Sequence, residues 1–284
     1  MNSETKTKTL TGKINAILIQ IFITIAALFF LTPIAIVINY SFKNKKELYL
    51  NSPLSLPQEF SFKNYLTAIK KLNMVTTFTN TFIYTAISVL LLAVLCGAAA
   101  WAIARCRHKF FKFSYVYFLI GILIPYQALF LPIYIVGFKI GLTNTRAGVI
   151  LMYIATGISF GVFLMTSFMS TVPIEIEEAA RIDGCSVYRT YFSIVMPLLK
   201  PAIATLAIMQ SFIIWNDYLM ASLFVSSKQL KTLTVAMQAL FSQQTSDYTT
   251  AMAAIVISVL PIAILFVSLQ KYFIKGMTVG AVKG

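Results

Sequence analysis

Uncharged apolar segments alternate along the chain with connectors that carry nearly all of its charged residues. Five segments contain no charge, and a sixth contains only Asp217. Each is long enough for the roughly 20 apolar residues with which an α-helix crosses a bilayer. The pattern predicts an all-α integral membrane protein with six transmembrane helices, at about residues 15–40, 77–104, 113–138, 148–170, 202–225 and 250–272.

The first segment follows three lysines, as the apolar core of a secretory signal does. Such a core is usually about 7–15 residues long. This segment is about twice that length and has no clear cleavage site between small residues. We therefore expect it to be retained as the first span.

Composition excludes several classes of protein. The 284 residues are 58% hydrophobic and 11% charged, whereas soluble domains have about 45–50% apolar and about 25% charged residues. An ordinary soluble enzyme or a disordered chain does not fit this balance. Three scattered cysteines, Cys96, Cys106 and Cys185, give neither a disulfide framework nor a zinc site. The net charge of +14 suits a lipid bilayer with anionic headgroups, and no basic stretch lies in a soluble domain large enough to bind nucleic acid.

Six spans place both termini on the same side of the membrane. If that side is the cytoplasm, 13 Lys and Arg residues lie inside and 10 lie outside, a weak bias in the direction of the positive-inside rule. The dense basic connector at 105–112 favours the same orientation. The predicted organisation is a cytoplasmic N-terminal tail (1–14), a transmembrane domain (15–273) and a cytoplasmic C-terminal tail (274–284).

The chain lacks the residues that membrane enzymes and ion-driven carriers commonly need. No G-x-x-x-x-G-K-[ST] loop is present to bind ATP. The single histidine, His108, lies in a basic connector, and no paired acids or Ser/His arrangement falls within a span. Proton-driven carriers commonly have several intramembrane ionisable groups, but here Asp217 is the one carboxylate within a span. We expect no catalytic, cofactor-binding or metal-binding residue.

The connector at about 171–200 predicts two short helices joined at a glycine. Pro173 suits the first position of a helix, and three glutamates follow in the opening turns, where the helix dipole favours acids. Gly184 suits the left-handed residue that ends a helix, and Ser186 can cap the next one. The small pair Ala179–Ala180 gives the first helix a face that another protein can approach closely.

The order of residues in this connector resembles a known signature. Glu178-Ala179-Ala180, three residues, Gly184, nine residues and then Ile194-x-Met196-Pro197 match the E-A-A-x3-G-x9-I-x-L-P sequence of binding-protein-dependent ABC importer permeases. Met196 in place of Leu is the one departure, and the two side chains have similar volumes. The runs E-E-A-A-R-I-D-G, P-L-L-K-P-A, W-N-D-Y-L, K-T-L-T-V-A and K-G-M-T-V-G-A-V-K-G resemble the carbohydrate-uptake branch, specifically the second permease subunit of maltose-type systems.

The resemblance implies a set of partners and a location. The chain would pair with a second homologous permease, couple to two ATPase subunits that carry ATP and Mg²⁺, and receive a sugar, expected to be a di- or oligosaccharide, from an extracytoplasmic binding protein. It would be a multi-pass protein of a bacterial or archaeal plasma membrane, with no catalytic role of its own. The residues implied in ATPase coupling are Glu178, Ala179, Ala180, Gly184, Ile194 and Pro197.

A sugar path needs hydrogen-bonding groups and aromatic faces inside the spans. The candidates are Asn80, Tyr84, Gln127, Gln210, Asn216 and Asp217, of which Asp217 is the most costly to place at bilayer depth. Two other functions stay open. An ABC permease for a non-sugar solute would share the loop and differ in the path. An ion-coupled secondary transporter would function without ATPase partners and would show internal repeats, which we do not find.

Overall fold

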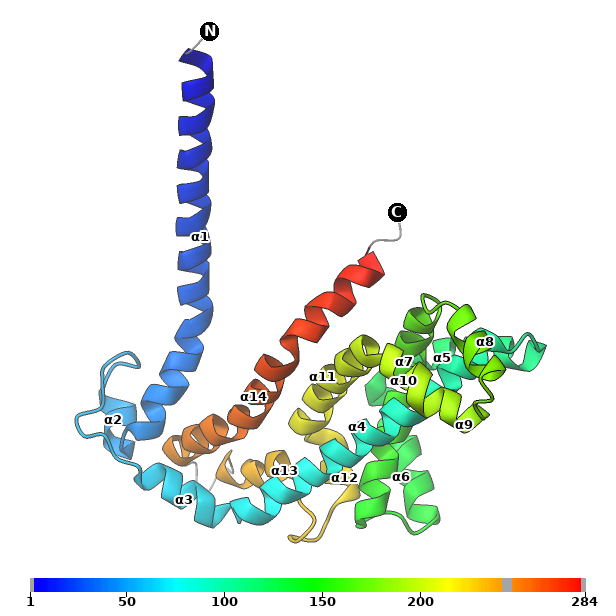
Figure 1. Ribbon diagram of the computed structural model, residues 1–284. Helices are drawn as coiled ribbons and strands as arrows, with labels where there is room; N and C mark the ends of the chain where they lie inside the picture. Colours follow the sequence, from blue (N-terminus) through cyan, green and yellow to red (C-terminus); the bar gives the residue numbers. More distant parts are fainter. Residues whose placement is uncertain (1–2, 242–246, 282–284) are drawn as a thin grey trace. The chain divides into compact units, whose positions relative to one another are not determined.

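The computed structural model describes residues 3–241 and 247–281 (Figure 1), and these contain helices and no strand. Four of the described helices are long and apolar enough to cross a membrane, and two bent helix pairs raise the number to as many as six if each pair is one span. The four are α1 (Ser3–Phe42, with the span Asn15–Phe42), α4 (Met74–Arg105), α7 (Arg146–Met169) and α14 (Tyr248–Ala281, with the span Tyr248–Gln270). The predicted all-helical membrane fold is confirmed. The predicted terminal tails, 1–14 and 274–284, include residues outside the described part of the chain.

The third predicted span, 113–138, is wrong as a single helix. It consists of α5 (Lys109–Leu123), the 3₁₀ turn η1 (Tyr126–Leu129) and α6 (Phe130–Lys139), with a bend of 102° between the two halves. The bend lies at Ile124 and Pro125, both of which are extended, with ψ of 122° and 129°. Proline has no N–H to donate and disfavours helical backbone at the residue before it, so the helix ends there.

The fifth predicted span, 202–225, is also interrupted. Helix α11 (Lys200–Asn216) ends at Asp217, whose ψ is 126°, and a short helix α12 (Leu219–Phe224) follows. At its other end α11 is bent by 73° from the segment Val187–Leu198. Apolar residues continue through these breaks, so the hydropathy of the sequence does not predict where the helices are interrupted.

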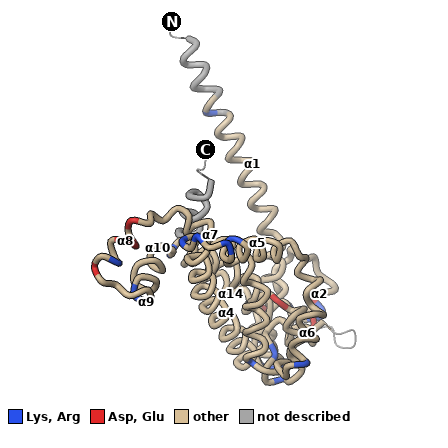
Figure 2. The backbone as a smooth tube through the Cα atoms, turned by 90° about the vertical axis from the view of Figure 1, so that its right-hand side faces the viewer, with Lys and Arg blue, Asp and Glu red and all other residues tan. Residues whose placement is uncertain are grey.

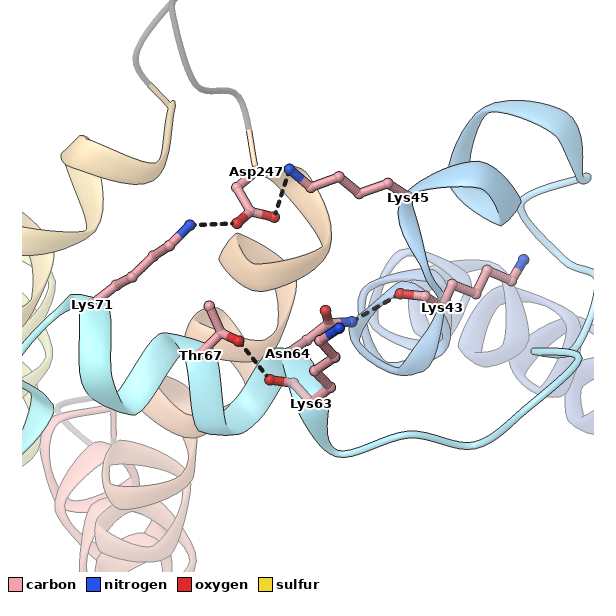
Figure 3. Close-up of polar contacts among 7 residues, drawn as sticks. All are labelled: Lys43, Lys45, Lys63, Asn64, Thr67, Lys71 and Asp247. Carbon is pink, nitrogen blue, oxygen red and sulfur yellow. Dashed lines mark hydrogen bonds and ion pairs between the residues drawn. The ribbon is translucent and has the colours of Figure 1, made fainter.

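The chain divides into two compact units, of which the first comprises Met1–Lys71 and Leu240–Ile257. It contains α1, α2 (Lys45–Leu50), α3 (Lys63–Lys71) and the first turns of α14. Lys43 is buried, and its Nζ donates to the Ser52 carbonyl and to Ser55 Oγ, each at 3.0 Å. Asn64 Nδ2 donates to the carbonyl of Lys43 at 2.8 Å, which holds α3 against the end of α1 (Figure 3).

A second polar cluster in this unit surrounds Asp247. The carboxylate lies 2.7 Å from Lys71 Nζ and 3.7 Å from Lys45 Nζ (Figure 3). Asp247 immediately precedes α14, and the two lysines belong to α3 and α2. These ion pairs join three helical segments that are far apart in the sequence.

The second unit comprises Leu72–Ala239 and Ser258–Gly284, and its centre is the packing of α4 on α7 and α11. Glycines on α7 permit the close approach of these helices. A Cβ at Gly161 would lie 2.5 Å from Cys96 Sγ, and one at Gly157 would lie 2.9 Å from Gln210 Oε1.

The remaining short elements of the unit are α8 (Glu175–Ile182), α9 (Val187–Thr190), the π-helical turn η2 (Tyr191–Val195), α10 (Met196–Leu198) and α13 (Leu233–Met237), while η3 (Gln238–Phe241) lies at its boundary.

Candidate functional site: the coupling loop and the path

The connector at 171–200 folds as two short helices joined at a left-handed glycine, as predicted. The first helix is α8, and Gly184 follows it with φ of +78°. The second begins with α9, where Ser186 Oγ accepts a hydrogen bond from Arg189 N at 3.3 Å. We call α8 to α10 the coupling loop. Figure 2 shows it as a lobe beside the bundle that contains α4 and α7, with the acidic residues of α8 on the lobe.

The outward face of the coupling loop carries most of the residues predicted to meet an ATPase. Glu178, Ala179 and Gly184 are exposed, while Ala180 is buried. Ile194 is half-buried and Pro197 is exposed. Large apolar side chains are exposed around them, namely Ile174, Ile176, Ile182, Val187, Tyr188 and Phe192. An exposed apolar cluster of this kind beside charged residues is typical of a surface that a second protein covers.

The inward face of α8 is held by a residue that the sequence did not single out for a role. Glu177 is 1% exposed, and both of its oxygens are bonded to α4. Oε2 accepts from Trp101 Nε1 at 2.7 Å, and Oε1 accepts from Arg105 Nε at 2.8 Å. Arg105 also donates to the Val172 carbonyl at 2.7 Å. A signal was available: Glu177 lies three residues before the small Ala180, so the two share a helix face that can approach a neighbour.

The second half of the coupling loop is attached to the same part of α4. Tyr191 is buried, and its ring stacks on that of Trp101 with centroids 5.6 Å apart. Its hydroxyl donates to the Val94 carbonyl at 2.7 Å. Tyr191 also belongs to a buried apolar cluster with Met169, Val195 and Leu199. This cluster packs the second half of the loop against the end of α7.

Two of the predicted path residues, Asn80 and Tyr84, hold a connector of the protein itself. Asn80 Nδ2 donates to the carbonyls of Gln229 and Lys231 at 2.7 and 3.1 Å, and Tyr84 Oη donates to that of Leu230 at 3.1 Å. Both side chains are buried on α4. Their donors are therefore used to fix the segment 229–231.

Asp217 occupies the break between α11 and α12, and its carboxylate caps the second helix. Oδ2 accepts from Ala221 N and from Tyr153 Oη, each at 2.9 Å, and Oδ1 accepts from Met220 N at 3.3 Å. Backbone N–H groups at the start of a helix have no partner within it, so a carboxylate there stabilises the helix. Asn216 is exposed and donates to the Phe212 carbonyl at 2.8 Å, and Gln127 is exposed on η1.

A cavity of about 500 Å³ lies among α5, η1, α7 and α11. Of the predicted path residues it contains Gln210. Its other polar lining consists of Tyr126, Tyr153, Thr156 and Ser159, and Ile124, Pro125, Phe160, Met209 and Ile213 are among its apolar lining residues. The bend at Pro125 contributes to this cavity, because Gly121 to Tyr126 form part of its wall. The lining does not include the other predicted path residues, which are Asn80, Tyr84, Gln127, Asn216 and Asp217.

Comparison with known proteins identifies the chain at the level of the family. Residues 90–279, which include the whole coupling loop, match the family described as the binding-protein-dependent transport system inner membrane component. The chain belongs to this family. It is thus a membrane permease subunit, as the signature in the coupling loop predicted.

Relatives of this permease are named for carbohydrate transport. It is 37% identical over 259 residues to the probable starch degradation products transport system permease protein AmyC of Thermoanaerobacterium thermosulfurigenes, covering 91% of this chain and 94% of the relative. It is also 37% identical over 253 residues to the melibiose/raffinose/stachyose import permease protein MelC of Bacillus subtilis, covering 89% and 91%. A crystal structure of a bacterial ABC transporter involved in the import of the acidic polysaccharide alginate matches with a TM-score of 0.78 and 25% identity, covering 94% of this chain and 98% of that one.

Proposed function

We propose that this permease is one of two membrane subunits of an ATP-driven importer, and that ATP and Mg²⁺ bind to separate ATPase subunits. The observation that carries the proposal is the two-sided geometry of the coupling loop. One face is bonded to α4 through Glu177, and the other presents Glu178, Ala179 and apolar side chains such as Tyr188 to a partner. The sequence contains no G-x-x-x-x-G-K-[ST] loop, which supports ATP binding by another chain.

The imported solute is a sugar, received from an extracytoplasmic binding protein. The names of the relatives support a carbohydrate, and the family description supports the binding protein. The cavity has groups of the right chemistry, because the Gln210 amide and the hydroxyls of Tyr126, Thr156 and Ser159 can bond sugar hydroxyls. The Tyr126 ring offers an apolar face for a pyranose.

The coupling loop and both termini lie on the cytoplasmic side. The ion pair between Arg105 and Glu177 supports one part of this orientation, since it keeps the basic connector 105–112 and the loop at the same end of α4. Basic residues close to spans accumulate on the cytoplasmic side. The segment 229–231, bonded to the other end of α4, is then extracytoplasmic.

Co-purification of the ATPase subunits tests the docking. Reversal of one exposed charge, Glu178→Lys, is expected to reduce the ATPase recovered with the permease pair severalfold. Glu59→Lys is the matched control, because it reverses an exposed glutamate in the other unit. Equal ATPase recovery in the two variants would contradict the docking surface.

Thiol labelling tests the orientation. Cys106 and Cys185 are first replaced by serine, and Cys96 is buried. A cysteine at the exposed Ser186 is expected to resist an impermeant reagent in intact cells and to react after permeabilisation. A cysteine at the exposed Ser52 is expected to react in intact cells. Labelling of both sites from the same side contradicts the orientation.

A further inference from the structure

Four side chains join the coupling loop to one end of α4, and we call them the α4 anchor: Trp101, Arg105, Glu177 and Tyr191. Glu177 is the central member, since its carboxylate accepts from both Trp101 and Arg105 and is 1% exposed. Arg105 is 15% exposed at its side chain, so the ion pair is largely withdrawn from solvent. A buried ion pair with good hydrogen-bond geometry has one favourable arrangement and resists small displacements, because separation would leave buried charges unpaired.

Trp101 connects the two halves of the loop to each other as well as to α4. Its indole N–H donates to Glu177 of α8, and its ring stacks on Tyr191 of η2 with an interplanar angle of 22°. Tyr191 is bonded in turn to the Val94 carbonyl. The two short helices are thus held by a shared side chain and have to move together with the Val94–Arg105 end of α4.

The opposite end of α4 is bonded to a different connector. Asn80 and Tyr84 hold the carbonyls of residues 229–231 through three hydrogen bonds. Helix α4 has 32 residues, which corresponds to about 48 Å at 1.5 Å per residue. Between the two ends it packs on α7 and α11, which line the 500 Å³ cavity. A tilt of the anchored end therefore displaces the other end and the connector attached to it.

We propose that the α4 anchor transmits the movement of the coupling loop into α4, so that Glu177, Trp101 and Arg105 are positioning residues for energy coupling. This inference rests on the proposed function, in which an ATPase moves the loop. Glu178 and Glu177, adjacent in the sequence, then have separate tasks. Glu178 faces the ATPase, and Glu177 fixes the loop to the span that responds.

The test separates transmission from docking. In the reconstituted complex, Glu177→Gln replaces one acceptor oxygen by an NH₂ group that faces a donor of α4. We expect the variant to co-purify with the ATPase as the wild type does and to hydrolyse ATP, while the amount of sugar imported per ATP falls at least fivefold. Glu175→Gln is the matched control, because Glu175 is an exposed glutamate of the same helix, and it is expected to keep the wild-type ratio.

Trp101→Phe provides a second variant that keeps the ion pair and removes one hydrogen bond. It is expected to lower the ratio of sugar to ATP by a smaller factor, with normal ATPase recovery, and it tests the inference if Glu177→Gln does not assemble. A wild-type ratio in an assembled Glu177→Gln complex would overturn the inference, as would a wild-type ratio in Trp101→Phe. Failure of the proposed function looks different, because the ATPase would then be absent from the wild-type complex.

Discussion

The hydroxyl of Tyr191 donates a hydrogen bond to the Val94 carbonyl of α4 and lies next to Gly97, which has no side chain. A Cβ at Gly97 would lie 2.8 Å from Tyr191 Oη, closer than two unbonded heavy atoms can approach. The bond of 2.7 Å from Tyr191 to the Val94 carbonyl therefore depends on a glycine three residues further along α4. The same glycine brings α4 close to Met196 of the coupling loop, whose Sδ would be 3.3 Å from the added Cβ.

Gly97→Ala is expected to displace Tyr191 and to break its hydrogen bond to α4. The lost bond corresponds to about 0.5–1.5 kcal/mol of stability, measured as a lower melting temperature of the purified complex. Tyr191→Phe removes the same bond. The loss of stability in the double variant should therefore be smaller than the sum of the losses in the two single variants. Fully additive losses would contradict the contact.

Gly184 has a different requirement, because the described residues leave room for a side chain there and its backbone conformation is what excludes most other residues. Its φ is +78°, and within residues 3–241 and 247–281 no atom lies within 4 Å of an added Cβ. Gly184→Val is expected to cost roughly 1–2 kcal/mol in the turn, to lower ATPase recovery and to leave membrane insertion intact. Gly184→Asn is the control, since asparagine tolerates the left-handed region, and it should recover most of the binding. Wild-type uptake with Gly184→Val would contradict the role of the turn.

Much of the coupling loop could be predicted from the sequence because its signals are local. A glycine at φ +78° and a serine that caps the following helix need only neighbouring residues, and both predictions are confirmed. The inward position of Glu177 depends on Trp101 and Arg105, which are more than seventy residues away. No pattern within the loop fixes such a partner.

Polarity alone does not identify a transport path, because polar residues inside a span have two uses. Polarity makes Asn80, Tyr84 and Asp217 candidates for a path, but their side chains bond to the protein's own backbone. A membrane interior supplies no water to satisfy exposed backbone groups, so breaks in helices need such partners. The bend at Pro125, which forms part of the cavity wall, was hidden by the continuous hydrophobic pattern around it.

Asp217→Asn is expected to retain substantial uptake. With its carbonyl oxygen at the position of Oδ2, asparagine still accepts from Tyr153 and Ala221 and loses only the longer bond from Met220. Asp217→Leu loses all three and leaves donors unpaired at about 1–3 kcal/mol each, so it should be much less stable and less active. Uptake and melting temperature across pH check both. Abolished uptake in a stable Asn variant would indicate a proton-relay role.

The ion pairs of Asp247 should stabilise the protein at neutral pH and lose their effect in acid. Burial alone would raise the pKa of Asp247, but hydrogen bonds from Lys71 and Thr250 and the charges of Lys71 and Lys45 outweigh it and lower the pKa below its ordinary value. A carboxylate with a depressed pKa stabilises the folded state above its unfolded pKa, and this stability is lost as pH falls through the folded pKa.

Asp247→Asn is therefore expected to lower stability by about 0.2–1 kcal/mol, the range for partly exposed ion pairs. The difference from the wild type should be constant between pH 8 and about pH 5 and should shrink below pH 4, near the ordinary carboxyl pKa. Thermal unfolding of the two proteins at matched pH measures it. A difference that grows as pH falls would contradict the ion pairs.

Uptake by the reconstituted complex tests whether this permease imports sugar with energy from a separate ATPase. Proteoliposomes with the permease pair, the ATPase and the binding protein loaded with radiolabelled sugar are supplied with ATP, or with a pH gradient and no ATP. We expect uptake with ATP alone, and its loss when the ATPase is omitted or the coupling loop carries Glu178→Lys. Uptake driven by the pH gradient in liposomes that lack the ATPase would contradict it.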